Sequence, residues 1–308
     1  MKTDILAAID IGSNAVRFLI NYLTIDGNAY SLKKASYLRI PIRLGEDVFS
    51  RGHISTDKAR RLLMAMQGFT HIAKAFGVSD IRACATSAMR DAKNGQDIAV
   101  AISDNTGIEL VIIDGEKEAE LVYMASFNKD MPPLDGPALF VDVGGGSTEL
   151  VLHKNGKLHC HDSFRLGTVR MLSYKETGND TVLGMEKQHL KSCLSGIHDQ
   201  YAPKHMVASG GNINKTHKLL GKKSGEPIRL EELTNFLLAL KPMSIGERMR
   251  TFGLNDYRAD VIVPALEIFL CILEACPSIR KIHVPKIGLA DGLIHELCRN
   301  RLEAGFYN

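Results

Sequence analysis

The chain has 308 residues, of which 45% are hydrophobic and 24% are charged, with a formal net charge of +3. These proportions are ordinary for a globular protein of two domains, and the small net charge gives no reason to expect nucleic acid as a partner. No apolar run approaches the ~18 residues that cross a bilayer, and the acidic Asp4 argues against a signal peptide, so we expect neither a membrane protein nor a secreted one.

The first half of the chain predicts a three-stranded meander followed by alternating helices and strands. The strands of the meander lie near 5–11, 16–24 and 29–39, with a turn signal at 26–28. The later elements are a helix capped by Ser55 that runs to about Phe76, a strand at 81–85, a helix near 94–106, a strand at 109–113 and a helix from about Glu116.

The second half repeats this plan, with a hairpin turn at Asn155-Gly156. Its predicted elements are strands near 138–143, 148–153 and 157–164, helices near 168–176 and 184–200, a strand at 205–208, a helix that starts at 209–212, and helices near 229–239, 244–250, 258–275 and 291–303. The proline-rich stretch 131–137 is the clearest linker. We therefore expect an N-terminal domain at 1–125 and a C-terminal domain at 126–308, with the last helix a candidate to pack back on the first domain.

A glycine-rich turn led by an aspartate follows the first strand of each half. The first turn reads Asp10-Ile11-Gly12-Ser13-Asn14, and the second reads Asp142-Val143-Gly144-Gly145-Gly146-Ser147-Thr148-Glu149. Consecutive amides in such turns form a nest for an anion, and hydroxyl and amide side chains add donors. The pattern indicates two phosphate-binding turns with contacts at Gly12, Ser13, Asn14, Arg17, Gly144, Gly145, Gly146, Ser147 and Thr148, although Arg17 could equally face solvent.

The aspartates repel phosphate, so Asp10 and Asp142 fit best if Mg²⁺ or a water lies between each of them and the phosphate. Two ordinary tight hairpins are the alternative, and for the first turn it stays open. Three successive glycines are entropically costly, which favours a functional reason for the second turn. There is no Walker A loop, and because neither turn opens a helix, the Rossmann fingerprint is excluded as well.

Further segments complete a pattern. Residues 85–90 read ATSAMR, residues 115–119 read GEKEA, and matching segments lie at 242–248 and 258–264. With the two turns, they resemble the exopolyphosphatase and guanosine-pentaphosphate phosphohydrolase family over nearly the whole chain. The resemblance implies an α/β fold of two ribonuclease H-like domains, of the actin, sugar-kinase and Hsp70 superfold, with an interdomain cleft.

The resemblance also implies a Mg²⁺-dependent exopolyphosphatase, which removes the terminal phosphate of inorganic polyphosphate. The closest alternative is 5′-phosphohydrolysis of guanosine pentaphosphate. A kinase of the same superfold that uses ATP, and a nucleotide-binding sensor without turnover, are further alternatives. A homodimer is compatible with this family. The six scattered cysteines form no C-x-x-C pair, which favours reduced core thiols and a cytoplasmic location.

The resemblance assigns the role of catalytic base to Glu118. From the residues alone, Glu118 is better explained as a carboxylate stabilised at a helix start by the dipole, and the resemblance reverses that preference. Arg90 is the candidate to hold a terminal phosphate, because a guanidinium makes two-point contacts with phosphate oxygens; its alternative is a surface arginine. Asp142 is a candidate catalytic residue and, with Glu149, a candidate Mg²⁺ ligand. Candidate nucleotide or polyphosphate contacts are Gly210, Gly211 and Asn212.

Overall fold

The computed structural model describes residues 2–26, 29–126, 131 and 133–303. The chain divides into two compact units, of which unit 1 comprises Met1–Ala125 and Leu289–Asn308, and unit 2 comprises Ser126–Gly288. Part of the turn signal at 26–28, namely Gly27 and Asn28, lies outside the described residues, as does Pro132 of the linker stretch. No helix in the described part of the chain has the length and hydropathy that membrane crossing requires.

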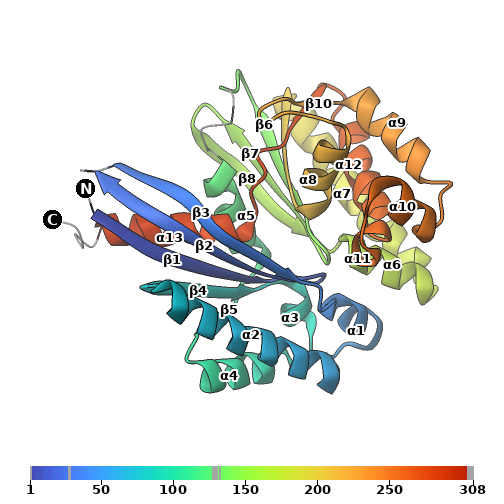
Figure 1. The fold of residues 1–308 in the computed structure, drawn as a ribbon. Helices are drawn as coiled ribbons and strands as arrows, with labels where there is room; N and C mark the ends of the chain where they lie inside the picture. Colours follow the sequence, from blue (N-terminus) through green and yellow to red (C-terminus); the bar gives the residue numbers. More distant parts are fainter. Residues whose placement is uncertain (1, 27–28, 127–130, 132, 304–308) are drawn as a thin grey trace. The chain divides into compact units, whose positions relative to one another are not determined.

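Unit 1 contains a five-stranded sheet in the order β3-β2-β1-β4-β5 (Figure 1). Its strands are β1 (Lys2–Ile11), β2 (Val16–Asp26), β3 (Ala29–Ile40), β4 (Asp80–Ala85) and β5 (Leu110–Ile112). The first three pair antiparallel, as the sequence predicts, whereas β4 runs parallel to β1 and β5 runs parallel to β4. The carboxyl ends of β1, β4 and β5 therefore meet at one edge of the sheet.

Helices cover both faces of this sheet. They are α1 (Leu44–Arg51), α2 (Thr56–Phe76), α3 (Ser87–Asp91), α4 (Gly95–Thr106), α5 (Gly115–Ser126) and α13 (Leu289–Glu303). Ile9 of β1 lies in one apolar cluster with Met66 and Phe69 of α2. Successive strand residues face opposite sides, and α13 packs along β1 and β2 on the other face (Figure 1). The last helix of the chain thus belongs to the core of unit 1.

Unit 2 contains a six-stranded sheet in the order β10-β11-β9-β6-β7-β8. Its strands are β6 (Ala138–Val143), β7 (Thr148–Lys154), β8 (Lys157–Phe164), β9 (His205–Ser209), β10 (Ile228–Arg229) and β11 (Lys281–His283). Apart from β10, this order repeats that of unit 1, with an antiparallel meander beside strands parallel to its first member. The duplicated plan predicted from the sequence is confirmed.

The helices of unit 2 pack its apolar side chains into one large cluster. They are α6 (Thr168–Glu176), α7 (Asp180–Tyr201), α8 (Gly211–Leu219), α9 (Leu230–Leu240), α10 (Ile245–Phe252), α11 (Asp256–Ala259) and α12 (Ile262–Ala275). Val141 of β6 lies in the cluster with Leu190 of α7 and Phe269 of α12. This packing fixes the carboxyl end of β6, where the second glycine turn begins.

The structure differs from the sequence prediction at several short elements. The predicted helix at 258–275 is two helices, α11 and α12, and at the break the Ala259 carbonyl accepts from the Arg248 guanidinium at 3.0 Å. The elements α1, α3, β10 and β11 were not predicted. All six cysteines are free thiols, as expected. Burial, with a smaller effect of the Asp10 carboxylate, raises the pKa of Cys84 to about 12.

Candidate active site

The first glycine turn joins β1 to β2 at the carboxyl edge of the unit 1 sheet. The Gly12 amide donates to the Ala15 carbonyl at 3.1 Å and closes the turn. The Ser13 hydroxyl lies 2.8 Å from the Ser87 hydroxyl of α3, and both serines are buried. Because α3 follows β4, this contact joins the turn to the neighbouring parallel strand.

Arg17 and Asp10 lie opposite each other on β2 and β1, and their side chains form an ion pair. The Asp10 carboxylate is buried, and the Arg17 guanidinium provides its counter-charge. The sequence suggested that a cation or a water lies next to Asp10. The ion pair supplies positive charge at Asp10 from within the chain.

Glu118 lies in the first turn of α5, which follows β5 at the same edge of the sheet. Asp114 caps this helix, since its Oδ1 accepts from the Lys117 amide at 2.8 Å. The Glu118 side chain is 8% exposed, and its Oε2 lies 3.9 Å from Arg90 Nη1. The same Arg90 nitrogen donates to the Ile113 carbonyl at 2.6 Å, so one guanidinium links α3 to the start of α5. The structure therefore brings together two of the residues predicted for catalysis.

The second glycine turn joins β6 to β7 in unit 2. The Gly144 amide donates to the Ser147 carbonyl at 3.0 Å and closes it, as in the first turn. Ser147 and Thr148 are buried. The Thr148 hydroxyl donates to the Leu166 carbonyl at 2.5 Å, which satisfies its hydrogen within the chain. Thr148 thus supports the turn, and the phosphate contact expected of it stays a prediction.

Asp142 and Glu149 are directly opposite each other on β6 and β7, so their carboxylates project from the same face of the sheet. The Ser209 hydroxyl donates to Asp142 Oδ1, and the Ser163 hydroxyl donates to Glu149 Oε1 at 3.0 Å. Glu149 is buried. Because like charges directly opposite each other are destabilising, this pair favours a bound cation. Carboxylate oxygens are the ligands that Mg²⁺ prefers, so the pair fits that ion.

The Gly210–Asn212 segment lies beside the second turn, since β9 runs parallel to β6. Gly210 has φ 106°, and a Cβ there would lie 2.7 Å from the Val143 carbonyl oxygen, so glycine is required. The Arg258 guanidinium donates to the Gly211 carbonyl. Three candidate features of unit 2, namely the turn, the carboxylate pair and this segment, therefore share one edge of one sheet.

Sequence reasoning missed the residues that hold the site in place. They are Ser87 at the first turn, Ser163 and Ser209 at the carboxylates, and Arg170, whose Nε donates to the Gly146 carbonyl at 2.6 Å. Ser209 stands one residue before a predicted contact, but its hydrogen bond to Asp142 was not predicted. Ser163 and Arg170 are joined to the site only by tertiary structure, and no local signal in the sequence marks them.

Comparison with known proteins identifies a family. The model of the Ppx/GppA phosphatase family matches residues 28–301. A bifunctional 3-dehydroquinate synthase/phosphatase of Fusobacterium nucleatum is 32% identical over 290 residues, which is 87% of this chain and 43% of that protein. Exopolyphosphatase 1 of Mycobacterium tuberculosis is 33% identical over 145 residues, which is 47% of this chain and 41% of that protein. The chain spans less than half the length of these curated relatives.

Solved structures with similar folds cover almost the whole chain. An exopolyphosphatase from Cytophaga hutchinsonii has a TM-score of 0.83 at 21% identity and covers 96% of this chain and 98% of its own. The Aquifex aeolicus Ppx/GppA family member has a TM-score of 0.75 at 24% identity and covers 97% and 99%. These similarities establish the fold, and they confirm the predicted α/β class of two ribonuclease H-like domains.

Proposed function

Because the chain belongs to the Ppx/GppA phosphatase family, we propose that it hydrolyses the terminal phosphoanhydride of inorganic polyphosphate with Mg²⁺. The observation that carries the proposal is the pair of carboxylates, Asp142 and Glu149, on the two strands that flank a turn with three glycines. A cation held by that pair and an anion held by the turn amides are what a phosphoryl-transfer enzyme requires.

Two further arguments favour polyphosphate as the substrate. The relative of Mycobacterium tuberculosis is an exopolyphosphatase by name, and it matches nearly half of this chain. The second support is the presence of one glycine turn in each unit, because a chain of phosphates offers many equivalent oxygens to backbone amides. Guanosine pentaphosphate offers fewer phosphates and adds a base and a ribose.

In the proposed reaction, Glu118 takes a proton from water as the water oxygen attacks the terminal phosphorus. The bond from that phosphorus to the bridging oxygen breaks, and the shortened chain leaves with the bridging oxygen. Arg90, anchored on the Ile113 carbonyl, offers its remaining N–H groups to the oxygens of the transferring phosphoryl group. The turn amides and Ser147 hold the oxygens that do not react.

Asp142 and Glu149 would hold Mg²⁺, which when bound neutralises negative charge on the phosphoryl group. Ser209 donates to the Asp142 carboxylate and Ser163 donates to the Glu149 carboxylate, so each proposed ligand is oriented by a hydroxyl group. Burial of Glu149 limits water around that ligand. These features support the proposal that the two carboxylates take part in binding the ion.

The test is a side-by-side assay of phosphate release from long-chain polyphosphate and from guanosine pentaphosphate. We expect turnover of polyphosphate, and a loss of about 10²–10⁴-fold in Glu118→Gln, which keeps the size of the side chain and removes the base. If only guanosine pentaphosphate is turned over, the nucleotide and not polyphosphate is the substrate. Binding of either without turnover would identify a sensor, and equal rates for wild type and Glu118→Gln would remove Glu118 from the mechanism.

A further inference from the structure

The carbonyl groups of the three glycines in the second turn are all bound by the start of α6. The Gly144 carbonyl accepts from the Thr168 amide at 3.1 Å. The Gly145 carbonyl accepts from the Val169 amide at 2.8 Å and from the Arg170 amide at 3.1 Å. The Gly146 carbonyl accepts from Arg170 Nε at 2.6 Å. Arg170 is buried. The first helical amides, which have no partners within their own helix, here bind the turn.

Gly167, just before α6, permits this arrangement. A Cβ at Gly167 would lie 2.4 Å from the backbone nitrogen and carbonyl carbon of Gly146, a separation that real Cβ atoms do not show. Two backbones therefore touch at this point, and only glycine allows it. The contact sets the distance between the turn and the helix before any side chain contributes.

The first glycine turn is bound by the start of α1 in the same way. The Gly45 amide donates to the Ser13 carbonyl at 2.8 Å, and the Arg43 amide donates to the Asn14 carbonyl at 3.1 Å. Arg43, the residue before α1, is left-handed with φ 58° and ψ 49°. A residue other than glycine in this conformation is costly and persists only where its surroundings hold it.

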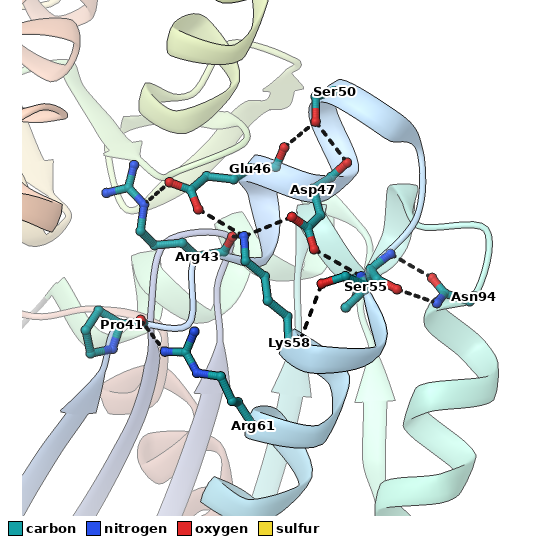
Figure 2. Close-up of polar contacts among 10 residues, drawn as sticks. Pro41, Arg43, Glu46, Asp47, Ser50, Ser55, Lys58, Arg61 and Asn94 are labelled. Carbon is teal, nitrogen blue, oxygen red and sulfur yellow. Dashed lines mark hydrogen bonds and ion pairs between the residues drawn. The ribbon is translucent and has the colours of Figure 1, made fainter.

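Lys58 of α2 supplies that support (Figure 2). Its ammonium donates to the Arg43 carbonyl at 2.7 Å and to Glu46 Oε2 at 2.9 Å, and it lies 3.1 Å from Asp47 Oδ1. An ammonium has three donors, and all are used here. Lys58 lies in the first turn of its helix, where the dipole disfavours a positive charge, so these contacts, not the helix, explain the lysine.

Asp47 shows that the cluster is electrostatically coupled. Burial by itself raises the pKa of the Asp47 carboxyl, but hydrogen bonds from Ser55 and the Lys58 ammonium outweigh it and hold this pKa below its usual value. The Asp47 carboxylate also accepts from the Ser55 amide at 3.0 Å, at the cap of α2. The cluster therefore joins α1, α2 and the first turn into one rigid group.

The bound carbonyls dictate where the turn amides point. The structure contains no cis peptide among its described residues, and in a trans peptide unit the C=O and N–H groups point in opposite directions. With the carbonyls of residues 144–146 directed to α6, the amides of residues 145–147 point away from α6. In the first turn, the amides of residues 14–15 likewise point away from α1.

We propose that α1 and α6 act as clamps on the carbonyl side of the two glycine turns, with Lys58 and Arg170 as positioning residues that aim the turn amides at phosphate. Neither side chain has to touch the substrate. The inference rests on the proposed function in taking phosphate as the ligand of those amides, whereas the clamps themselves are testable without substrate.

The first arm of the test measures amide hydrogen exchange in the free protein. In Lys58→Met, peptides covering 12–19 and 42–50 should exchange about tenfold faster, as local opening predicts, and those covering 144–151 and 166–173 should not change. Arg170→Met should show the reverse. Arg60→Met is the matched control, because this arginine of α2 is exposed and its contacts with Asp57 and Met64 stay within its own helix. Unchanged exchange at the clamped turn would overturn the proposal.

The second arm measures kcat/KM for polyphosphate. We expect each variant to lose about 10- to 100-fold, the range found when supporting residues are removed. The effects of Lys58→Met and Ser13→Ala on kcat/KM should be non-additive, whereas those of Lys58→Met and Ser147→Ala should add. For Arg170→Met, we expect additivity with Ser13→Ala and non-additivity with Ser147→Ala. Lys58→Arg and Arg170→Lys, which keep a charged donor, should recover most of the loss and serve if either methionine variant does not fold.

The outcomes separate the clamp from the proposed function. A wild-type protein that turns over neither polyphosphate nor guanosine pentaphosphate refutes the function, and the exchange data then decide on the clamp alone. If activity is present but both positioning variants combine additively with both serine variants, the clamps are structural only and the proposal is wrong.

Discussion

Ser209 illustrates how one hydroxyl orients a proposed metal ligand. It donates to Asp142 Oδ1 and lies 3.3 Å from the Val141 carbonyl, so the carboxylate is held in one orientation. Such supporting hydrogen bonds orient metal ligands and are worth about 10- to 100-fold in metal affinity. The neighbouring Gly210 could not carry a Cβ without contact with the Val143 carbonyl.

The first prediction at this scale concerns Ser209→Ala. The loss of the hydroxyl frees the Asp142 carboxylate to rotate, so the Mg²⁺ concentration for half-maximal phosphate release should rise about 10-fold or more. Calorimetric titration of the free protein with Mg²⁺ should show the same shift. Ser195→Ala, which removes an exposed serine that donates to the Lys191 carbonyl of its own helix, is the control. Equal Mg²⁺ dependence in the two variants would contradict the role given to Ser209.

Single residues also show the limit of sequence reasoning. The aspartate and glycine residues of both turns form a local sequence pattern, and this pattern predicted the turns correctly. Thr148 and Asp10 were assigned from the same letters, but their partners, the Leu166 carbonyl and the Arg17 guanidinium, depend on strand pairing and on the path of the chain after β8. The hydrogen-bond partner of a buried polar group is fixed by tertiary structure, so the residue type alone cannot identify that partner.

At the scale of elements, long periodic segments were predictable and short ones were not. The strands of both meanders and helix α2, with its Ser55 cap and Gly77 end, follow from patterns that extend over many residues. The three-residue strand β11 is too short to show any period. Helix α1 has only eight residues and follows a left-handed arginine, which no propensity favours. These short elements nevertheless include α1, the proposed clamp on the first glycine turn.

The packing of α13 supports a second prediction, which concerns stability. A Cβ at Gly292 would lie 2.2 Å from the Leu121 carbonyl oxygen, so Gly292→Ala should force α13 away from α5 and destabilise unit 1 by about 1–3 kcal/mol, as overpacking does. A Cβ at Gly184 of α7 would meet no atom within 4 Å, so Gly184→Ala should stabilise the protein by about 0.5–1 kcal/mol. Urea unfolding measures both. Similar changes in the two variants would contradict this packing.

For the whole molecule, the sequence predicted the duplication because each copy carries its own aspartate-glycine turn after its first strand. The comparison with solved structures confirms the fold that this duplication implies. The sequence could only suggest that α13 belongs to unit 1, since this membership depends on contacts between the two ends of the chain. The proposed reaction has one requirement, which is that residues of both units act on the same substrate.

That requirement is tested most directly by a double-variant cycle on Glu118 of unit 1 and Asp142 of unit 2, read as kcat for phosphate release from polyphosphate. Residues that act as one catalytic group are strongly non-additive. We predict that Glu118→Gln and Asp142→Asn each lower kcat about 10²–10⁴-fold and that the double variant is about as slow as the slower single variant. Effects that multiply in the double variant, or a normal rate in either single variant, would contradict the account.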